Sequence, residues 1–262
     1  MRPTLMIAFG CIGLWWSADA RPATAQTSDE LVDQAAAAGE QGDHAQAIRL
    51  ATQALDKDAG AAQAYYVRGR ERFRSGAAEE AVADFDRYIE LRPEAAPRQW
   101  ERGIACYYAG KFAEGARQFE SYQRFDGQDV ENSVWRYLCV VPLEGVERAQ
   151  ATMLPIENDR RVPMMQIFEL YRGRLKPADV MAAVTSGAPA ADVRAAREFY
   201  AHLYLALWYE SQNQPTEAAR YLDLAANPRL REVRGVNRYM WDVARIHQQK
   251  LRKRVSSTPA AK

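Results

Sequence analysis

The stretch RGIACYYAG, residues 102–110, repeats a pattern that occurs 34 residues earlier as RGRERFRSG, residues 68–76. Each begins with Arg-Gly and ends with a second glycine seven residues after the first. Laying 68–93 over 102–127 gives five matches, which are Arg68 with Arg102, Gly69 with Gly103, Gly76 with Gly110, Ala81 with Gly115, and Phe85 with Phe119. The same offset extends more weakly to 28–61, through Gly42 and Ala47. A period of this length predicts stacked units of two helices.

Small residues at fixed places in the period predict where the two helices of a unit cross. Gly69 and Gly103 lie on the first helix, and Ala81 and Gly115 lie on the second. A large side chain at any of these places would hold the helices apart, because interaxial distance depends on the side chains at the contact. Glycines that follow a helical stretch are expected at positive φ, and these are Gly42, Gly76 and Gly110.

One such unit cannot bury its apolar face alone, so units must stack and the rest of the chain should be helical too. We therefore expect an all-α protein. The predicted parts are a signal peptide over 1–25, two-helix units over 28–61, 62–95 and 96–129, an irregular helical segment over 130–197, a further unit over 198–231, a capping helix over 232–251, and a frayed tail over 252–262.

The amino end has the layout of a cleaved secretory signal. Arg2 precedes the apolar run 5–16, and small residues follow up to Ala25. This run is shorter than the roughly 20 residues that span a bilayer as a helix, so we expect no stable membrane span after cleavage. The apolar run continues past Cys11, which argues against a lipid anchor there. The mature protein is expected to be exported, either periplasmic or secreted.

Composition and motifs give no sign of catalysis or of nucleic-acid binding. The formal net charge is +1, so the chain lacks the excess of positive charge that favours binding to nucleic acid. The three histidines, His44, His202 and His247, are far apart, and no metal or nucleophile motif accompanies them. We expect no enzyme activity, no cofactor and no metal. Cys106 and Cys139 are expected to be small buried residues, with a disulfide as the alternative.

The period resembles the tetratricopeptide repeat, which has small residues at its eighth and twentieth positions and an aromatic residue at its twenty-fourth. The resemblance implies a right-handed superhelix in which the first helix of each unit lines a concave groove. The groove-facing places that we predict to bind a protein or peptide partner hold Gln63, Tyr66, Arg70, Arg74, Trp100, Tyr107 and Tyr108.

Aromatic residues and arginine carry much of the binding energy at interfaces, which favours this groove as the site. Packing against adjoining helices is the alternative for the aromatic residues. Arg70 and Arg74, spaced to receive one carboxylate together, are expected to be exposed. As a surface change, Arg74→Ala should then alter stability by less than about 0.5 kcal/mol.

Three longer stretches resemble the NlpI-type periplasmic tetratricopeptide repeat proteins, over roughly 60–250. They are RGIACYYAGKFAEGARQF, VWRYL and FYAHLYLALWYESQNQPTEAARYLDLA. The resemblance implies a non-enzymatic adaptor, with a homodimer among its states, that holds a protease or a peptidoglycan hydrolase in the cell envelope. The competing hypothesis is an enzyme or ligand-binding protein whose site lies in 130–197, since loss of the repeat pattern can accompany an acquired function.

Overall fold

The computed structural model describes residues 26–257, and this part of the chain is helical with no strand. The all-α prediction is confirmed. The predicted signal peptide, Cys11 and the last residues of the predicted tail, 258–262, lie outside the described residues. Within the described range, no helix combines the length and the apolar character needed to cross a membrane.

The helices of the first half come in consecutive pairs, and each pair falls within one predicted unit. Their bounds are α1 (Ser28–Gln41), α2 (His44–Lys57), α3 (Ala62–Arg74), α4 (Ala78–Leu91), the short 3₁₀ helix η1 (Pro93–Arg98), α5 (Trp100–Tyr108) and α6 (Phe112–Tyr122). The three turn glycines all have positive φ, as predicted, including Gly76 at 91° and Gly110 at 74°. Asp43 caps α2 by accepting a hydrogen bond from the backbone of Gln46 at 2.9 Å.

At the predicted crossings the paired helices approach so closely that only small side chains fit between them. A Cβ atom added to Gly103 would lie 2.6 Å from the Phe119 ring, and one added to Gly115 would lie 2.8 Å from the Cys139 sulfur. Ala81 is fully buried. The contact distances therefore explain the small side chains that recur in the period.

The second half continues the stack with less regular helices. They are α7 (Val130–Glu144), α8 (Val146–Ala151), α9 (Met164–Tyr171), α10 (Pro177–Val184), α11 (Ala191–Ser211), α12 (Pro215–Ala225), the 3₁₀ helix η2 (Pro228–Glu232) and α13 (Arg238–Ser257). α7 supplies large core residues, among them Trp135 and Tyr137. Cys106 and Cys139 are buried free thiols, in keeping with the packing role predicted for them.

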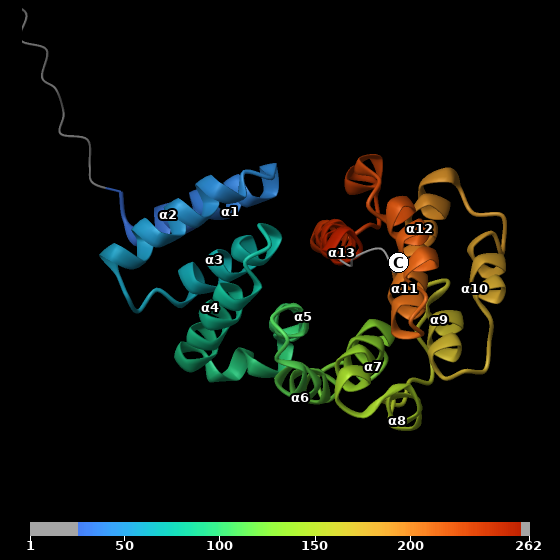
Figure 1. Cartoon of the computed structure of the whole chain (residues 1–262). Helices are drawn as coiled ribbons and strands as arrows, with labels where there is room; N and C mark the ends of the chain where they lie inside the picture. Colours follow the sequence, from blue (N-terminus) through green and yellow to red (C-terminus); the bar gives the residue numbers. More distant parts are fainter. Residues whose placement is uncertain (1–25, 258–262) are drawn as a thin grey trace, which may run out of the picture.

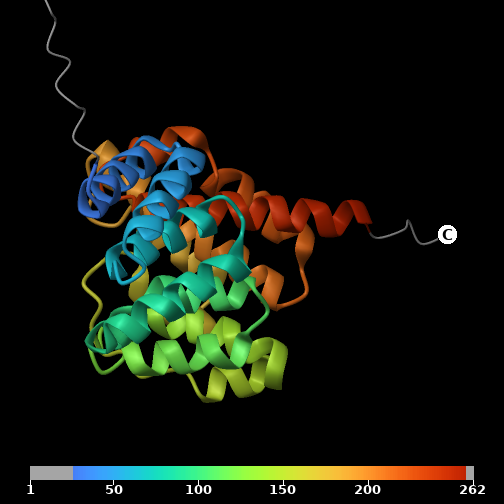
Figure 2. The ribbon, with the colours of Figure 1, turned by 90° about the vertical axis from the view of Figure 1, so that its left-hand side faces the viewer.

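The last helix, α13, occupies a place that the sequence did not indicate. It packs on α12, as a capping helix should, but it also contacts α3 near the other end of the chain. Figure 1 shows α13 end-on inside the curve that the other helices form, and Figure 2 shows it from the side. The bounds predicted for this helix, 232–251, are wrong. It begins at Arg238, because Glu232 ends η2 and Gly235 then adopts a positive φ of 92°, and it continues to Ser257.

The expectation of a frayed tail is wrong for residues 252–257, which belong to α13. Arg252 donates to Asp223 of α12 at 2.8 Å, and Arg254 is hydrogen-bonded to Glu210 of α11. These charges hold the last turns against the neighbouring pair of helices, so this basic stretch is part of the folded body.

Candidate binding site on the inner wall

The groove predicted for a partner is covered largely by the protein's own C-terminal helix. We call the surface under α13 the inner wall, formed by Phe73 and Arg74 of α3, Trp100 and Tyr108 of α5, and Glu210 of α11. Tyr239 of α13 stacks on Phe73 with ring centroids 5.1 Å apart and meets Trp100 edge-on at 5.2 Å. The hydroxyl of Tyr108 lies 2.9 Å from Nδ1 of His247.

Arg74 is 1 % exposed, so the prediction that it faces solvent is wrong. Its guanidinium donates to Asp242 of α13 at 2.8 Å, to Glu71 at 2.9 Å and to the carbonyl of Gly39 at 3.1 Å. Asp242 lies 168 positions further along the chain. No local pattern could reveal that partner, and helical spacing alone leaves Arg74 on the open side of its unit.

Arg70 and Tyr66 are half-buried and already have partners within the chain. The Tyr66 hydroxyl donates to Glu101 at 2.8 Å, and Nε of Arg70 lies 3.7 Å from the same carboxylate. The Arg70 guanidinium also lies over the ring of Tyr239, 5.7 Å from its centroid. Burial raises the pKa of Glu101 against the opposing charge of Arg70. Because Arg74 is engaged elsewhere, the two arginines are not arranged to receive one external carboxylate.

The other predicted groove residues differ in how much surface they offer. Tyr107 packs against Trp135 at a centroid distance of 5.6 Å and lies beneath the ammonium group of Lys250. Gln63 is exposed on the first turn of α3. Trp100 is half-buried and borders an unfilled space. The predicted residues thus lie on one side of α3 and α5, mostly under α13, and their role in binding a partner stays a prediction.

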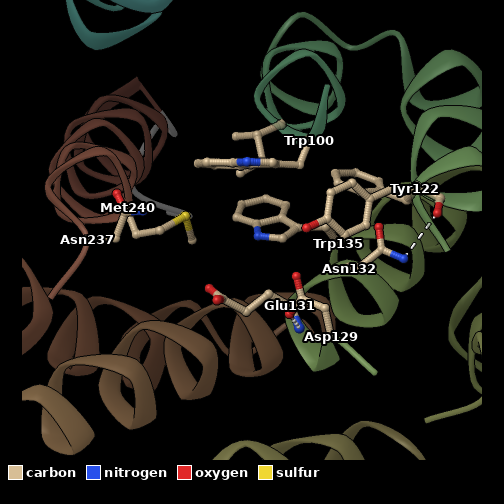
Figure 3. Close-up of a pocket in the computed structure, with 10 residues that line it drawn as sticks. Trp100, Tyr122, Asp129, Glu131, Asn132, Trp135, Asn237 and Met240 are labelled. Atoms are coloured by element: carbon tan, nitrogen blue, oxygen red, sulfur yellow. Dashed lines mark hydrogen bonds between the residues drawn. The ribbon is translucent and has the colours of Figure 1, made fainter. Parts of the chain in front are cut away.

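A cavity of about 180 Å³ remains between α5, α6, α7 and α13. Figure 3 shows the indoles of Trp100 and Trp135 one above the other, Met240 beside them, and the carboxylates of Glu131 and Asp129 on the far side of Trp135. The full lining consists of Trp100, Ile104, Phe119, Tyr122, Asp129, Glu131, Asn132, Trp135, Asn237 and Met240. The cavity therefore joins two indole surfaces to two acidic groups.

The two carboxylates are held in place by neighbouring side chains. Glu131 accepts from the Tyr204 hydroxyl at 2.6 Å and from Arg161 at 2.6 Å. Asp129 caps α7 through the backbone of Glu131 at 3.0 Å and accepts from Arg161 at 2.6 Å. Burial and the charge of Glu131 raise the pKa of Asp129 to about 6, although Arg161 opposes this. The charge of Glu131 therefore disfavours the ionised form of Asp129.

Two buried polar atoms at this cavity have no hydrogen-bond partner among the described residues. They are Nε1 of Trp135, whose side chain is 1 % exposed, and Oδ1 of Asn132, whose side chain is 3 % exposed. The Asn132 amide nitrogen donates to the Phe119 carbonyl at 3.1 Å, which fixes its oxygen on the other side. An unmatched buried polar group costs about 1–3 kcal/mol, and this donor and this acceptor are therefore available to hydrogen-bond a bound group or water.

A larger hollow of about 700 Å³ adjoins the cavity and shares Tyr122 and Asp129 with it. Its other lining residues are mostly charged or amide-bearing, namely Asp126, Gln128, Glu157, Asn158, Asp159, Arg160 and Arg161. Among the described residues, no three His, Cys, Asp or Glu side chains are grouped in a way that could hold a metal ion. The side chains that line these two spaces offer charge, hydrogen bonds and aromatic surface.

No protein-family model matches this sequence. Among solved structures, the chain is similar to a tetratricopeptide repeat protein from Parabacteroides merdae, with a TM-score of 0.49 and 14 % identity over 88 % of this chain and 87 % of that one. It is also similar to the Naa15/Naa10 complex bound to HypK-THB, with a TM-score of 0.40 and 14 % identity over 89 % of this chain and 37 % of that one. At this identity the similarities concern the fold.

The individual residues on the α7 side of the cavity were not predicted. Glu131, Asn132 and Trp135 fall in the segment 130–197, for which only a site without named residues was considered, and Asp129 ends the preceding unit. One signal was available. Glu131 and Trp135 are four residues apart, hence on the same face of a helix, and an acid beside an indole is unusual on an otherwise apolar helix.

Proposed function

We propose that this protein is a non-enzymatic scaffold for protein–protein interaction, and that its partner is bound at the cavity between Trp100 and Trp135. The observation that carries the proposal is the incomplete filling of the inner wall. α13 covers the faces of Tyr108 and Arg74 with buried contacts, yet it leaves a cavity with two unmatched polar atoms next to α5 and α7. Aromatic residues in a desolvated pocket are typical of interface hot spots.

The proposed cellular compartment, partner class and oligomeric state rest on the sequence patterns and not on the fold. The signal-like residues 1–25 support export to the periplasm or beyond. The resemblance to NlpI-type proteins supports a cell-envelope protease or peptidoglycan hydrolase as the partner, and a homodimer as one state of the scaffold. Light scattering of the mature chain would report the oligomeric state directly.

Site-specific photo-crosslinking tests where the partner binds. p-Benzoylphenylalanine replaces Tyr122, an aromatic residue that borders both the cavity and the adjoining hollow. The matched control carries the same cross-linker at Leu224, which is 44 % exposed on α12. We expect a discrete adduct in the native host from position 122 and none from position 224. Equal adducts from both positions, or none from a well-folded protein, would refute the proposed site.

The competing function, a ligand-binding protein or enzyme with its site in 130–197, also has one observation in its favour. α7 supplies Glu131, Asn132 and Trp135 to the cavity, so three of its ten lining residues come from that segment. Native mass spectrometry of protein purified from its host distinguishes the two functions. A small molecule retained by the native chain, and lost with Trp135→Ala, would favour this second function.

A further inference from the structure

We propose that the cavity between α5, α7 and α13 binds the side chain of a lysine or arginine residue of the partner. The indoles would contact its methylene groups, and the carboxylates would pair with its positive charge. This rests on the proposed interaction function and names the chemistry of the same site. Four side chains carry it, Trp100 and Trp135 for the aromatic surface and Asp129 and Glu131 for the negative charge.

The aromatic surface suits a cation with an apolar body. Lysine and arginine combine a chain of methylene groups with a charge that is attracted to the face of an indole. In Figure 3 the two indoles lie one above the other with Met240 next to them. A purely apolar ligand would match the indoles and the Met240 side chain but would leave the nearby carboxylates unpaired and poorly hydrated.

The charge of the site calls for a positive group. Asp129, Glu131 and Asp159 share a single guanidinium, that of Arg161, which donates to all three at 2.6 Å. Negative charge is therefore in excess at this end of the cavity. Burial and, after it, the charge of Glu131 raise the pKa of Asp129, and a bound cation would favour its ionised form. An anionic ligand is excluded on the same ground.

The unmatched polar atoms indicate a residue within a peptide rather than a bare ammonium ion. Oδ1 of Asn132 can accept from the N–H groups of the cation, whereas Nε1 of Trp135 needs an acceptor. A basic residue within a chain offers both, because its main-chain carbonyl accepts and its side chain donates. The adjoining hollow, with Asp126 and Glu157 among its lining residues, has room for flanking residues.

The test follows the indole N–H signal of Trp135 by NMR, assigned with Trp135→Phe, while blocked peptides are added to the full mature chain. The probes are acetyl-Gly-Lys-Gly-amide, its arginine equivalent, and its norleucine equivalent, which keeps the shape of lysine without the charge. We expect saturable shifts with lysine and arginine and an affinity at least about tenfold lower with norleucine. Equal binding of norleucine, or no shift with any peptide, would overturn the proposal.

Two charge-removing variants make the test specific to the site. Asp129→Asn keeps a good N-cap for α7, since asparagine and aspartate are about equally favoured there. It should weaken the lysine peptide about tenfold. The control Glu147→Gln removes the same charge from an exposed position on α8 and should leave the affinity unchanged. If Asp129→Asn binds as the native protein does, the carboxylate has no part in recognition and the proposal fails.

A further probe, n-butylammonium, separates a peptide from a free organic cation. Binding much weaker than that of the lysine peptide supports a peptide ligand, and equal binding overturns the peptide assignment. The two levels of the hypothesis can also fail separately. A partner cross-linked at position 122 without any response to lysine peptides would leave the scaffold standing and refute the basic ligand. Lysine binding without a cross-linked partner would refute the scaffold.

Discussion

Replacing Arg74 with alanine should destabilise the protein by about 3 kcal/mol, several times the change expected for a surface residue. The reason lies in what the substitution leaves behind. Asp242 is 1 % exposed and Glu71 is 3 % exposed, and each would lose the guanidinium of Arg74 within a buried region. The Gly39 carbonyl would also lose its donor.

The expected loss of stability depends on which partners Asp242 and Glu71 keep when Arg74 is removed. Removing one member of a buried ion pair costs roughly 3–5 kcal/mol when the other is left unpaired. Here Asp242 keeps Arg245 at 3.1 Å, and Glu71 keeps His44 at 2.6 Å. Both carboxylates thus retain some compensation, which places the expected loss at the lower end of that range.

Urea unfolding followed by far-UV circular dichroism, near neutral pH, measures this loss. Arg87→Ala is the matched control, because Arg87 pairs with Glu90 on the exposed face of α4 and its loss should leave the stability almost unchanged. In the double variant Arg74→Met with Asp242→Leu, the part of the loss that comes from the unpaired Asp242 should be recovered, since apolar residues can replace a buried pair at little cost. A loss below about 0.5 kcal/mol for Arg74→Ala would refute the buried location of this side chain.

Three further predictions concern packing, pH and thiol reactivity. Gly103→Ala should destabilise by about 1–3 kcal/mol in the same urea assay, because the added Cβ would meet the Phe119 ring at 2.6 Å. Although burial raises the pKa of Glu210, the hydrogen bond with His247 and neighbouring cations lower it from 4.5 to about 2. The ionised carboxylate therefore stabilises the fold above about pH 4.5, and this contribution is lost as pH falls towards 2. In Glu210→Gln, the fall in the free energy of unfolding between these pH values should be smaller by up to about 3 kcal/mol. Burial raises the pKa of the Cys106 thiol to about 11, so Ellman's reagent should modify it slowly in the native protein and rapidly in urea.

The two-helix units could be predicted from sequence because their signal is local and repeated. Glycines at the crossings and turns serve contacts within one unit or between neighbours, so the same requirement recurs every 34 residues. Pro177 and Pro215 begin α10 and α12, because proline suits the first position of a helix. The extent of α13 was harder to place, because Pro228 and the residues after it form η2 before the helix begins.

The environment of the inner wall could not be predicted, because it depends on contacts between distant parts of the chain. Arg74 looks like a solvent-facing residue until Asp242 is brought to it, and Tyr108 looks available for a ligand until His247 is placed beside it. Nothing in the repeat pattern specifies which segment will cover the concave side. The helix that was expected to close one end of the stack supplies that cover as well.

The crossing of α13 from α12 to α3 has a consequence for how the molecule is made. An open solenoid gains stability one neighbour at a time, and its modules can melt separately. Here the concave core is completed only by α13, so the helices before it are synthesised while that face is still uncovered. Such long-range contacts slow folding. Because α13 joins α12 to α3, we expect the helix pairs to unfold together rather than one after another.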